Sequence, residues 1–123
     1  VKIKDDDCLD AKPTVIPGVY NSILMRASKK LLRLELYIDT SDEARNLEII
    51  DHIKTKMKVP AALKGRIEYE RKEGRRAQRV CVSFPDFELS DRSCWAAYMQ
   101  DILSVADDFF DALEAQMREL IKP

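Results

Sequence analysis

Hydrophobic and polar residues alternate strictly in the middle of the chain, over Leu31–Asp39. One face of this segment is apolar, with Leu32, Leu34, Leu36 and Ile38. The other face carries Arg33, Glu35, Tyr37 and Asp39. A period of two is typical of a β-strand that is buried on one side. The segment is therefore predicted to be a strand of a sheet that has one covered face.

Three other segments fit the same kind of element. A short strand is expected at Ser22–Arg26, and a hairpin is expected from Arg66–Lys72 and Ala77–Phe84. Glu73–Arg76 would connect the two arms, with Gly74 able to supply a positive φ. These segments predict a sheet of four strands.

A first helix is predicted after Thr40. Thr40 and Glu43 have the spacing of a capping box, in which Thr40 caps the helix and Glu43 reaches back. The helix should end at Val59-Pro60, because the residue before proline avoids helical geometry. Its apolar side is formed by Leu47, Ile50, Ile53 and Met57.

A second, longer helix is predicted from about Asp91 to about Ile121, where the sequence has neither glycine nor proline. At 1.5 Å per residue it would be about 45 Å long, against about 26 Å for an eight-residue strand. One apolar stripe holds Trp95, Tyr98, Ile102, Val105, Phe109, Leu113 and Leu120. A second stripe holds Met99, Leu103, Ala106, Phe110, Met117 and Ile121. The two stripes together are wider than core packing alone requires.

The expected fold class is therefore α+β, in the order β-β-α-β-β-α. We expect a four-stranded antiparallel sheet with two helices on one face and a long C-terminal helix. Residues 1–19, interrupted by Pro13, Pro17 and Gly18, are expected to be a tail or linker. Residues 20–123 would form a single domain.

Composition narrows the function classes. The chain has 123 residues, 46% of them hydrophobic, and a net charge of −1, which argues against a generic nucleic-acid binder. Its apolar runs are too short to span a bilayer, so no membrane partner is expected. Cys8, Cys81 and Cys94 suit neither a disulfide framework nor a zinc site, which predicts reduced thiols and a cytoplasmic location.

The candidate catalytic residues in the sequence do not form a complete motif. His52 falls on the polar side of the first helix, where a solvated surface histidine is expected. Glu68, Glu70 and Lys72 resemble half of a restriction-type nuclease motif, but Pro85-Asp86 follows them, which is the reverse of the motif's order. Asp107, Asp108 and Asp111 could offer oxygens to a metal, although a solvated helix face is expected. We therefore expect no catalytic residues, no metal and no cofactor, with a metal-dependent hydrolase as a remote alternative.

Residues 64–79 form a locally basic hairpin, with seven basic and three acidic residues. Such a hairpin could lie along a phosphate backbone. Alternatively, its glutamates could pair with arginines across the strands. The candidate nucleic-acid contacts are Arg71, Lys72, Arg75, Arg76 and Arg79.

The surplus apolar width of the last helix has two interpretations. It could pack on the first helix, with the end of the long helix that extends beyond the sheet fraying or meeting residues 1–20. Alternatively, it could dock on a second copy of the chain or on an upstream domain of the same polypeptide. The candidate interaction surface is Trp95, Met99, Leu103, Phe110 and Met117.

Four segments together resemble a known family. They are LRLELYIDT, NLEIIDHIKTKMK, RIEYERKEGRRAQRVCVSF and DRSCWAAYMQDILSVADDFFDAL. In this order they resemble the prokaryotic domain of unknown function numbered 4268, whose members often lie C-terminal to nuclease-like or restriction-associated domains. The resemblance implies a non-catalytic accessory or interaction domain of a larger prokaryotic protein involved in nucleic-acid processing or defence.

Overall fold

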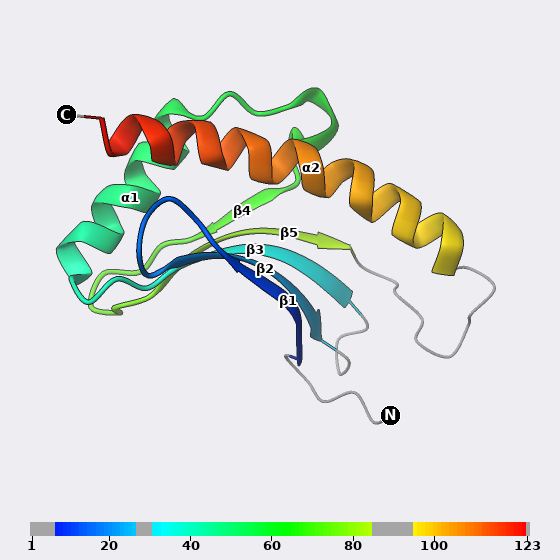
Figure 1. The fold of residues 1–123 in the computed structure, drawn as a ribbon, viewed down its shortest axis with the longest axis horizontal. Coiled ribbons are helices and arrows are strands. Elements are labelled where there is room, and N and C mark those ends of the chain that lie inside the picture. Colours follow the sequence, from blue (N-terminus) through cyan, green and yellow to red (C-terminus); the bar gives the residue numbers. More distant parts are fainter. Residues whose placement is uncertain (1–6, 27–30, 85–94, 123) are drawn as a thin grey trace.

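The computed structural model describes residues 7–26, 31–84 and 95–122. For residues 7–10, 25, 26, 31 and 95–99 it describes the backbone only. These residues form an α+β fold of two layers, a five-stranded antiparallel sheet and two helices that lie on the same face of it (Figure 1). The strands are β1 (Asp7–Pro13), β2 (Val19–Arg26), β3 (Leu31–Ile38), β4 (Ile67–Glu70) and β5 (Gln78–Phe84). The two α-helices are α1 (Glu43–Lys56) and α2 (Trp95–Leu120), and a short 3₁₀ helix, η2 (Ala61–Leu63), follows α1.

The strands lie in the order β1-β2-β3-β5-β4, so β3 is central. In its middle, Leu34 pairs with Ile23 on one side and with Val82 on the other. The chain leaves the sheet after β3, passes through α1 and η2, and returns at the far edge as β4. The expected hairpin of two antiparallel strands is thus confirmed as β4 and β5.

The sheet has one strand more than the four that the pattern predicts. Residues 7–13, expected to lie in a tail, form β1 and pair with β2 over Asp7↔Met25 to Pro13↔Tyr20. The pattern missed this strand because its register shifts between Cys8 and Asp10 and because it ends in proline. An edge strand tolerates both features, since it needs hydrogen bonds on one side only.

A tight turn joins β1 to β2. The Thr14 N–H donates to the Val19 carbonyl at 3.0 Å, and Gly18 adopts a φ of +87°. A Cβ at Gly18 would lie only 3.0 Å from the Asp39 carbonyl oxygen. The Asp39 N–H donates to the Gly18 carbonyl at 2.9 Å, which anchors the turn to the end of β3.

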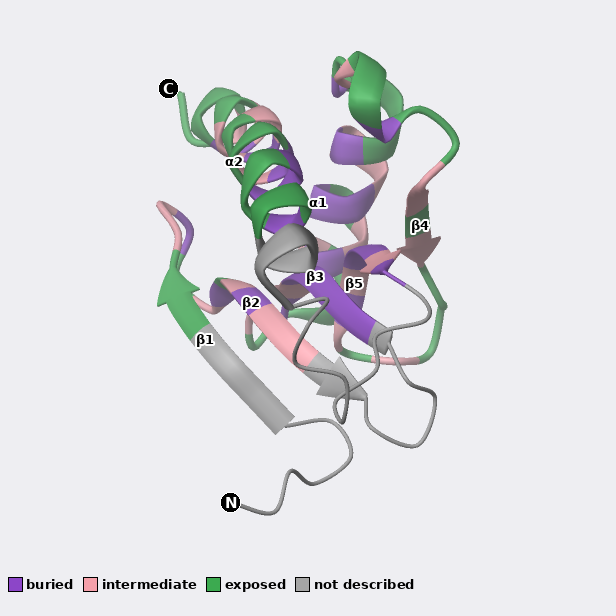
Figure 2. Ribbon diagram, turned by 90° about the vertical axis from the view of Figure 1, so that its right-hand side faces the viewer, coloured by how far each residue is buried: buried purple, intermediate pink, exposed green. Residues whose placement is uncertain are grey.

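The hydrophobic core lies between the sheet and the helices. The predicted apolar face of β3 is confirmed, because Leu32, Leu34, Leu36 and Ile38 are all at most 1% exposed. Figure 2 shows that the buried sides of α1 and α2 face the sheet and each other, while their outer sides are exposed. The helices contribute Ile49, Ile50, Ile53, Ile102, Phe109 and Leu113 to this core.

The start of α1 differs from the predicted capping box. Asp42, not Thr40, is the N-cap, and its carboxylate accepts from the N–H groups of Ala44 and Arg45 at 3.0 and 3.3 Å. Glu43 instead accepts from the N–H of Gly74, in the β4–β5 loop, at 3.0 Å. Thr40 and Asp42 lie two residues apart, both residue types favour the N-cap position, and aspartate is as good a cap as threonine or better.

The last helix begins at Trp95 in the structure, and its expected start at Asp91 lies outside the described residues. In the described part of the chain, no helix is both long and apolar enough to cross a bilayer.

Candidate functional site

The second apolar stripe of α2 is divided between core and surface. Ala106 and Met117 are buried, at 5% and 0% exposed, and belong to the hydrophobic core. Leu103 is 55% exposed, and Phe110 is half-buried. The side chains of Trp95 and Met99, the other two candidates for an interaction surface, lie outside the described residues.

A groove runs beside this stripe, between α2 and the β1–β2 edge of the sheet. Its volume is about 550 Å³, within the range of binding sites for small ligands and peptide side chains. Its apolar lining is formed by Val15, Ile23, Leu103, Ala106, Phe110 and Met117. The structure thus brings Leu103, Phe110 and Met117 to one groove, although it exposes them to very different extents.

The rim of the groove on the α2 side is acidic. Asp107 and Asp111 are exposed, Glu114 is partly exposed, and all three line the groove. Lys12 and Asn21 line it from the sheet side. The Asn21 Oδ1 atom is buried, and no hydrogen-bond partner is found for it in the described part of the chain. The groove therefore combines an apolar floor, a buried acceptor and an acidic rim on its α2 side.

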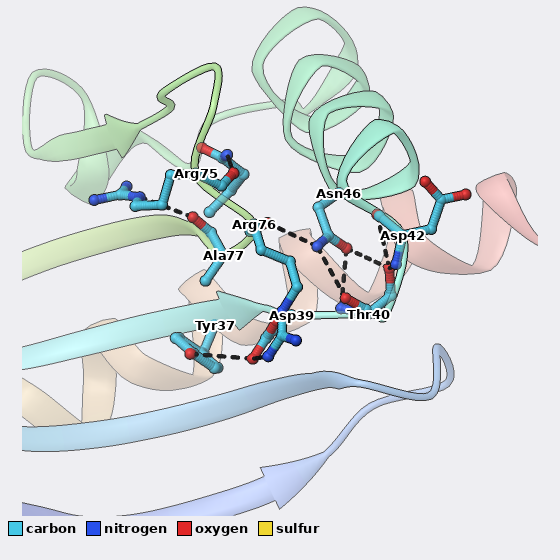
Figure 3. Close-up of polar contacts among 9 residues, drawn as sticks. Tyr37, Asp39, Thr40, Asp42, Asn46, Arg75, Arg76 and Ala77 are labelled. Atoms are coloured by element: carbon cyan, nitrogen blue, oxygen red, sulfur yellow. Dashed lines mark hydrogen bonds and ion pairs between the residues drawn. The ribbon is translucent and has the colours of Figure 1, made fainter.

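The basic hairpin is extensively neutralised by its own neighbours. Arg71 donates to both carboxylate oxygens of Asp51 in α1, at 2.5 and 3.1 Å. Arg76 does the same to Asp39 after β3, at 2.6 and 3.0 Å (Figure 3). These hydrogen bonds lower the pKa of both aspartates and raise the pKa of both arginines.

Two other arginines of the hairpin are partly buried and bonded to the fold. Arg75 donates to the carbonyls of Ala77 and Glu70, both at 2.9 Å. Arg79 lies 3.3 Å from the Glu35 carboxylate and above the ring of Tyr37, at 5.1 Å from its centroid. Of the five candidates, Lys72 is the one for which the described residues offer no carboxylate or carbonyl partner to the side chain.

The pairing explains why the hairpin's sequence overstates its positive charge. Its partners Asp39 and Asp51 come from distant segments and meet the hairpin only in the folded chain. Gln78, which sequence reasoning missed, is fully buried and organises the loop. Its side chain bonds the backbone of Lys72 in both directions, at 2.7 and 2.8 Å, and donates to the Arg75 carbonyl at 2.8 Å. A glutamine at the first position of a strand gives no signal of that role.

Among the described residues, His52 and Cys81 each have a structural environment in the fold, while Asp86, Cys94 and the side chain of Cys8 lie outside the described residues. His52 is partly exposed, and its Nε2 lies 3.0 Å from Oε1 of Gln116, so it links α1 to α2. Cys81 is free and fully buried, and burial raises the pKa of its thiol to about 12. Among the residues that the structure describes, no three histidine, cysteine, aspartate or glutamate side chains gather in a way that could hold a metal ion.

Comparison with family models, curated proteins and solved structures finds no match to this chain.

Proposed function

We propose that this chain is a non-catalytic interaction domain that binds a segment of a partner protein in the groove between α2 and the β1–β2 edge. The observation that carries the proposal is the exposure of Leu103. Leu103 is 55% exposed at a groove whose other apolar residues on α2 are buried or half-buried. An exposed apolar side chain next to an apolar groove is typical of a binding site for another chain.

The charge of the rim indicates the chemistry of the partner. Asp107, Asp111 and Glu114 would attract lysine or arginine side chains that flank an apolar anchor. A second copy of this chain would bring the same carboxylates against each other in a symmetric interface, and like charges repel. A segment with apolar and basic side chains therefore fits the groove better than a homodimer does.

The length of the groove sets the size of the segment. Its lining on α2 runs from Leu103 to Met117, a rise of about 21 Å along a helix. This equals the length of about six residues in extended conformation or about four turns of a helix. Short segments of this size are commonly bound in grooves through alternating or helically spaced anchors.

The wider setting of this domain is proposed from the family resemblance alone. The resemblance supports an accessory role in a larger prokaryotic protein of nucleic-acid processing or restriction-like defence. Direct contact with nucleic acid through the hairpin gains no support from the geometry, because Arg71, Arg76 and Arg79 are each paired with a carboxylate. No specific observation favours a hydrolase.

The proposal can be tested with a short amphipathic peptide of leucine and lysine. We expect it to bind at low salt and to shift the amide resonances of Leu103, Phe110 and Asp111 in an NMR titration. A matched peptide in which glutamate replaces every lysine should bind at least tenfold more weakly, because it meets a rim of the same charge. Equal binding of both peptides, or shifts confined to another surface, would overturn the proposal.

Two variants sharpen the test. Leu103→Asn removes the exposed apolar side chain at the groove without adding charge. It should lower the affinity for the lysine peptide about tenfold or more. Ser104→Asn, at the adjacent exposed position outside the groove, is the matched control and should leave affinity unchanged. Light scattering after size-exclusion chromatography should show a monomer, and a stable dimer that Leu103→Asn dissociates would favour the homodimer instead.

A further inference from the structure

A second hollow lies on the opposite face of the sheet from α1 and α2. Its volume is about 380 Å³, and strands β2, β3, β4 and β5 and the β4–β5 loop all contribute to it. Its charged lining consists of Arg33, Glu35, Glu70, Arg75 and Arg79. The face was expected to be the polar, solvated side of the sheet, yet Arg33 and Glu35 are only 6% and 3% exposed.

Two ion pairs account for most of this buried charge. Arg33 pairs with Glu70 across the sheet, and Arg79 pairs with Glu35 at 3.3 Å. Buried charges are tolerated when each has a partner of opposite sign. Three arginines against two glutamates nevertheless leave the lining with one positive charge in excess.

The excess charge falls on Arg75. Its Nε and one terminal nitrogen donate to the carbonyls of Ala77 and Glu70, which fixes the guanidinium but does not neutralise it. Within the described residues, no carboxylate forms an ion pair with Arg75. The guanidinium is thus held rigidly at the hollow, and a fixed donor loses little entropy when it binds an anion.

Arg33 provides a second and independent observation. Its side chain is 7% exposed and lines the hollow, and its Nε atom is buried without a hydrogen-bond partner among the described residues. A buried N–H that lacks an acceptor is costly, and an oxygen of a bound anion would satisfy it.

We propose that this hollow binds an organic monocarboxylate, with Arg75 and the Nε–H of Arg33 as donors. One carboxylate would balance the single excess positive charge, whereas a phosphate dianion would place a second negative charge beside Glu35 and Glu70. The Tyr37 ring, against which Arg79 lies, and Leu24 also line the hollow and suit an apolar or aromatic group next to the carboxylate. The volume is within the range of about 300–1,000 Å³ that small-ligand sites occupy.

The test is an NMR titration of the ¹⁵N-labelled chain at constant ionic strength, with benzoate as the probe. We expect saturable shifts of the Arg33 and Arg75 side-chain resonances. Benzamide, which lacks the charge, and inorganic phosphate should bind at least tenfold more weakly. The absence of saturable shifts with benzoate at tens of millimolar, or equal shifts with benzamide, would overturn the proposal.

Two variants should change the affinity for benzoate in opposite directions, which a loss of folding could not do. Arg75→Gln should weaken benzoate binding about tenfold or more, while Arg76→Gln, a neighbour already paired with Asp39, should change it less than about twofold. Glu70→Gln removes a negative charge from the lining and should strengthen binding. A Glu70→Gln variant that is folded but binds benzoate more weakly would contradict the charge argument.

The carboxylate could belong to a free small molecule or to the C-terminus of a peptide chain. A phenylalanine dipeptide with a free C-terminus, compared with its C-terminal amide, distinguishes these sources. Tighter binding of the free dipeptide than of benzoate assigns the hollow to chain termini, and weaker binding assigns it to small molecules. Because the hollow and the α2 groove lie on opposite faces of the sheet, each proposal can fail without the other.

Discussion

At the scale of single residues, a buried polar side chain connects three segments of the fold. Asn46 of α1 is fully buried, and it accepts from the Thr40 N–H at 3.0 Å. It also donates to the Arg76 carbonyl at 2.8 Å (Figure 3). One amide therefore joins the start of α1, the end of β3 and the β4–β5 loop. A single asparagine in an amphipathic helix gives no sequence signal of this role.

Asn46→Ala should lower the free energy of unfolding by about 2–4 kcal/mol, because it removes a fully buried amide and leaves the Thr40 N–H and the Arg76 carbonyl without that partner. Urea denaturation measures this loss. Glu48→Ala, on the exposed side of the same helix, is the matched control and should change stability by about 0.5 kcal/mol or less. Equal losses for the two variants would contradict the assigned role of Asn46.

Cys81 should behave as a buried thiol with a raised pKa. The folded-state pKa of about 12 lies above the ordinary value of 9.0. Between these two pH values the unfolded chain loses the thiol proton while the folded chain keeps it, which favours unfolding. The thiol's contribution to stability is thus complete below pH 9 and is lost between pH 9 and 12. Iodoacetamide at pH 8 should label Cys81 only after denaturation, as peptide mass spectrometry would show. Rapid labelling of the folded chain would contradict this burial.

At the scale of elements, one face of α2 packs in the hydrophobic core, and the adjacent face lines the groove. Adjacent phenylalanines mark the boundary, because Phe109 is fully buried while Phe110 lines the groove, with 5.3 Å between their ring centroids. Helical periodicity predicts the first stripe, which is buried from Ile102 to Leu113, but cannot tell how far the sheet extends beneath the second, where Leu103 is exposed. That extent depends on β1, which the sequence pattern does not predict.

Truncating the two phenylalanines should therefore have different costs. Phe109→Ala should destabilise the fold by about 3–5 kcal/mol, as is usual for a fully buried aromatic side chain. Phe110→Ala should cost about 1–2 kcal/mol, since its ring already contacts solvent. Denaturant unfolding of both variants provides the comparison, and a larger loss for Phe110→Ala would show that the groove belongs to the core.

Elements with a regular hydrophobic period are predicted from the sequence, whereas features that depend on contacts between distant segments are not. The alternation in β3, the β4–β5 hairpin and the long α2 is confirmed, because each is built from a regular period with one apolar face. The pattern predicts the N-cap of α1 at Thr40 rather than at Asp42, because both residue types favour that position. The charged hollow was not predicted, because Arg33, Glu35, Glu70 and Arg79 come together only through the pairing of β3, β5 and β4.

At the scale of the whole molecule, ion pairs tie the hairpin to the rest of the fold. Arg71 binds Asp51 of α1, and Arg76 binds Asp39 after β3. Both aspartates have a pKa below the ordinary value of 3.8, chiefly because of the arginine hydrogen bonds. The net charge of −1 is therefore the sum of arginines that are already paired with carboxylates and of carboxylates on α2 that are exposed.

These pairs predict how stability depends on pH. A carboxyl group whose pKa is lowered in the folded state stabilises the fold above its unfolded pKa, and this contribution is lost as the pH falls through the folded value. Stability should hence decline below pH 3.8. Asp39→Asn should lower stability at neutral pH and make the decline shallower, as thermal unfolding from pH 7 to pH 2 would measure. Asp101→Asn, on the exposed face of α2, is the matched control and should change stability at neutral pH by about 0.5 kcal/mol or less.

The most direct test of the account is the titration of the folded chain with the leucine–lysine peptide, comparing the native chain with Leu103→Asn. The account predicts saturable shifts along the groove from Leu103 to Glu114 in the native chain, and about a tenfold loss of affinity in the variant. Binding of the same strength by both chains would contradict the assignment of the α2 groove as the docking site.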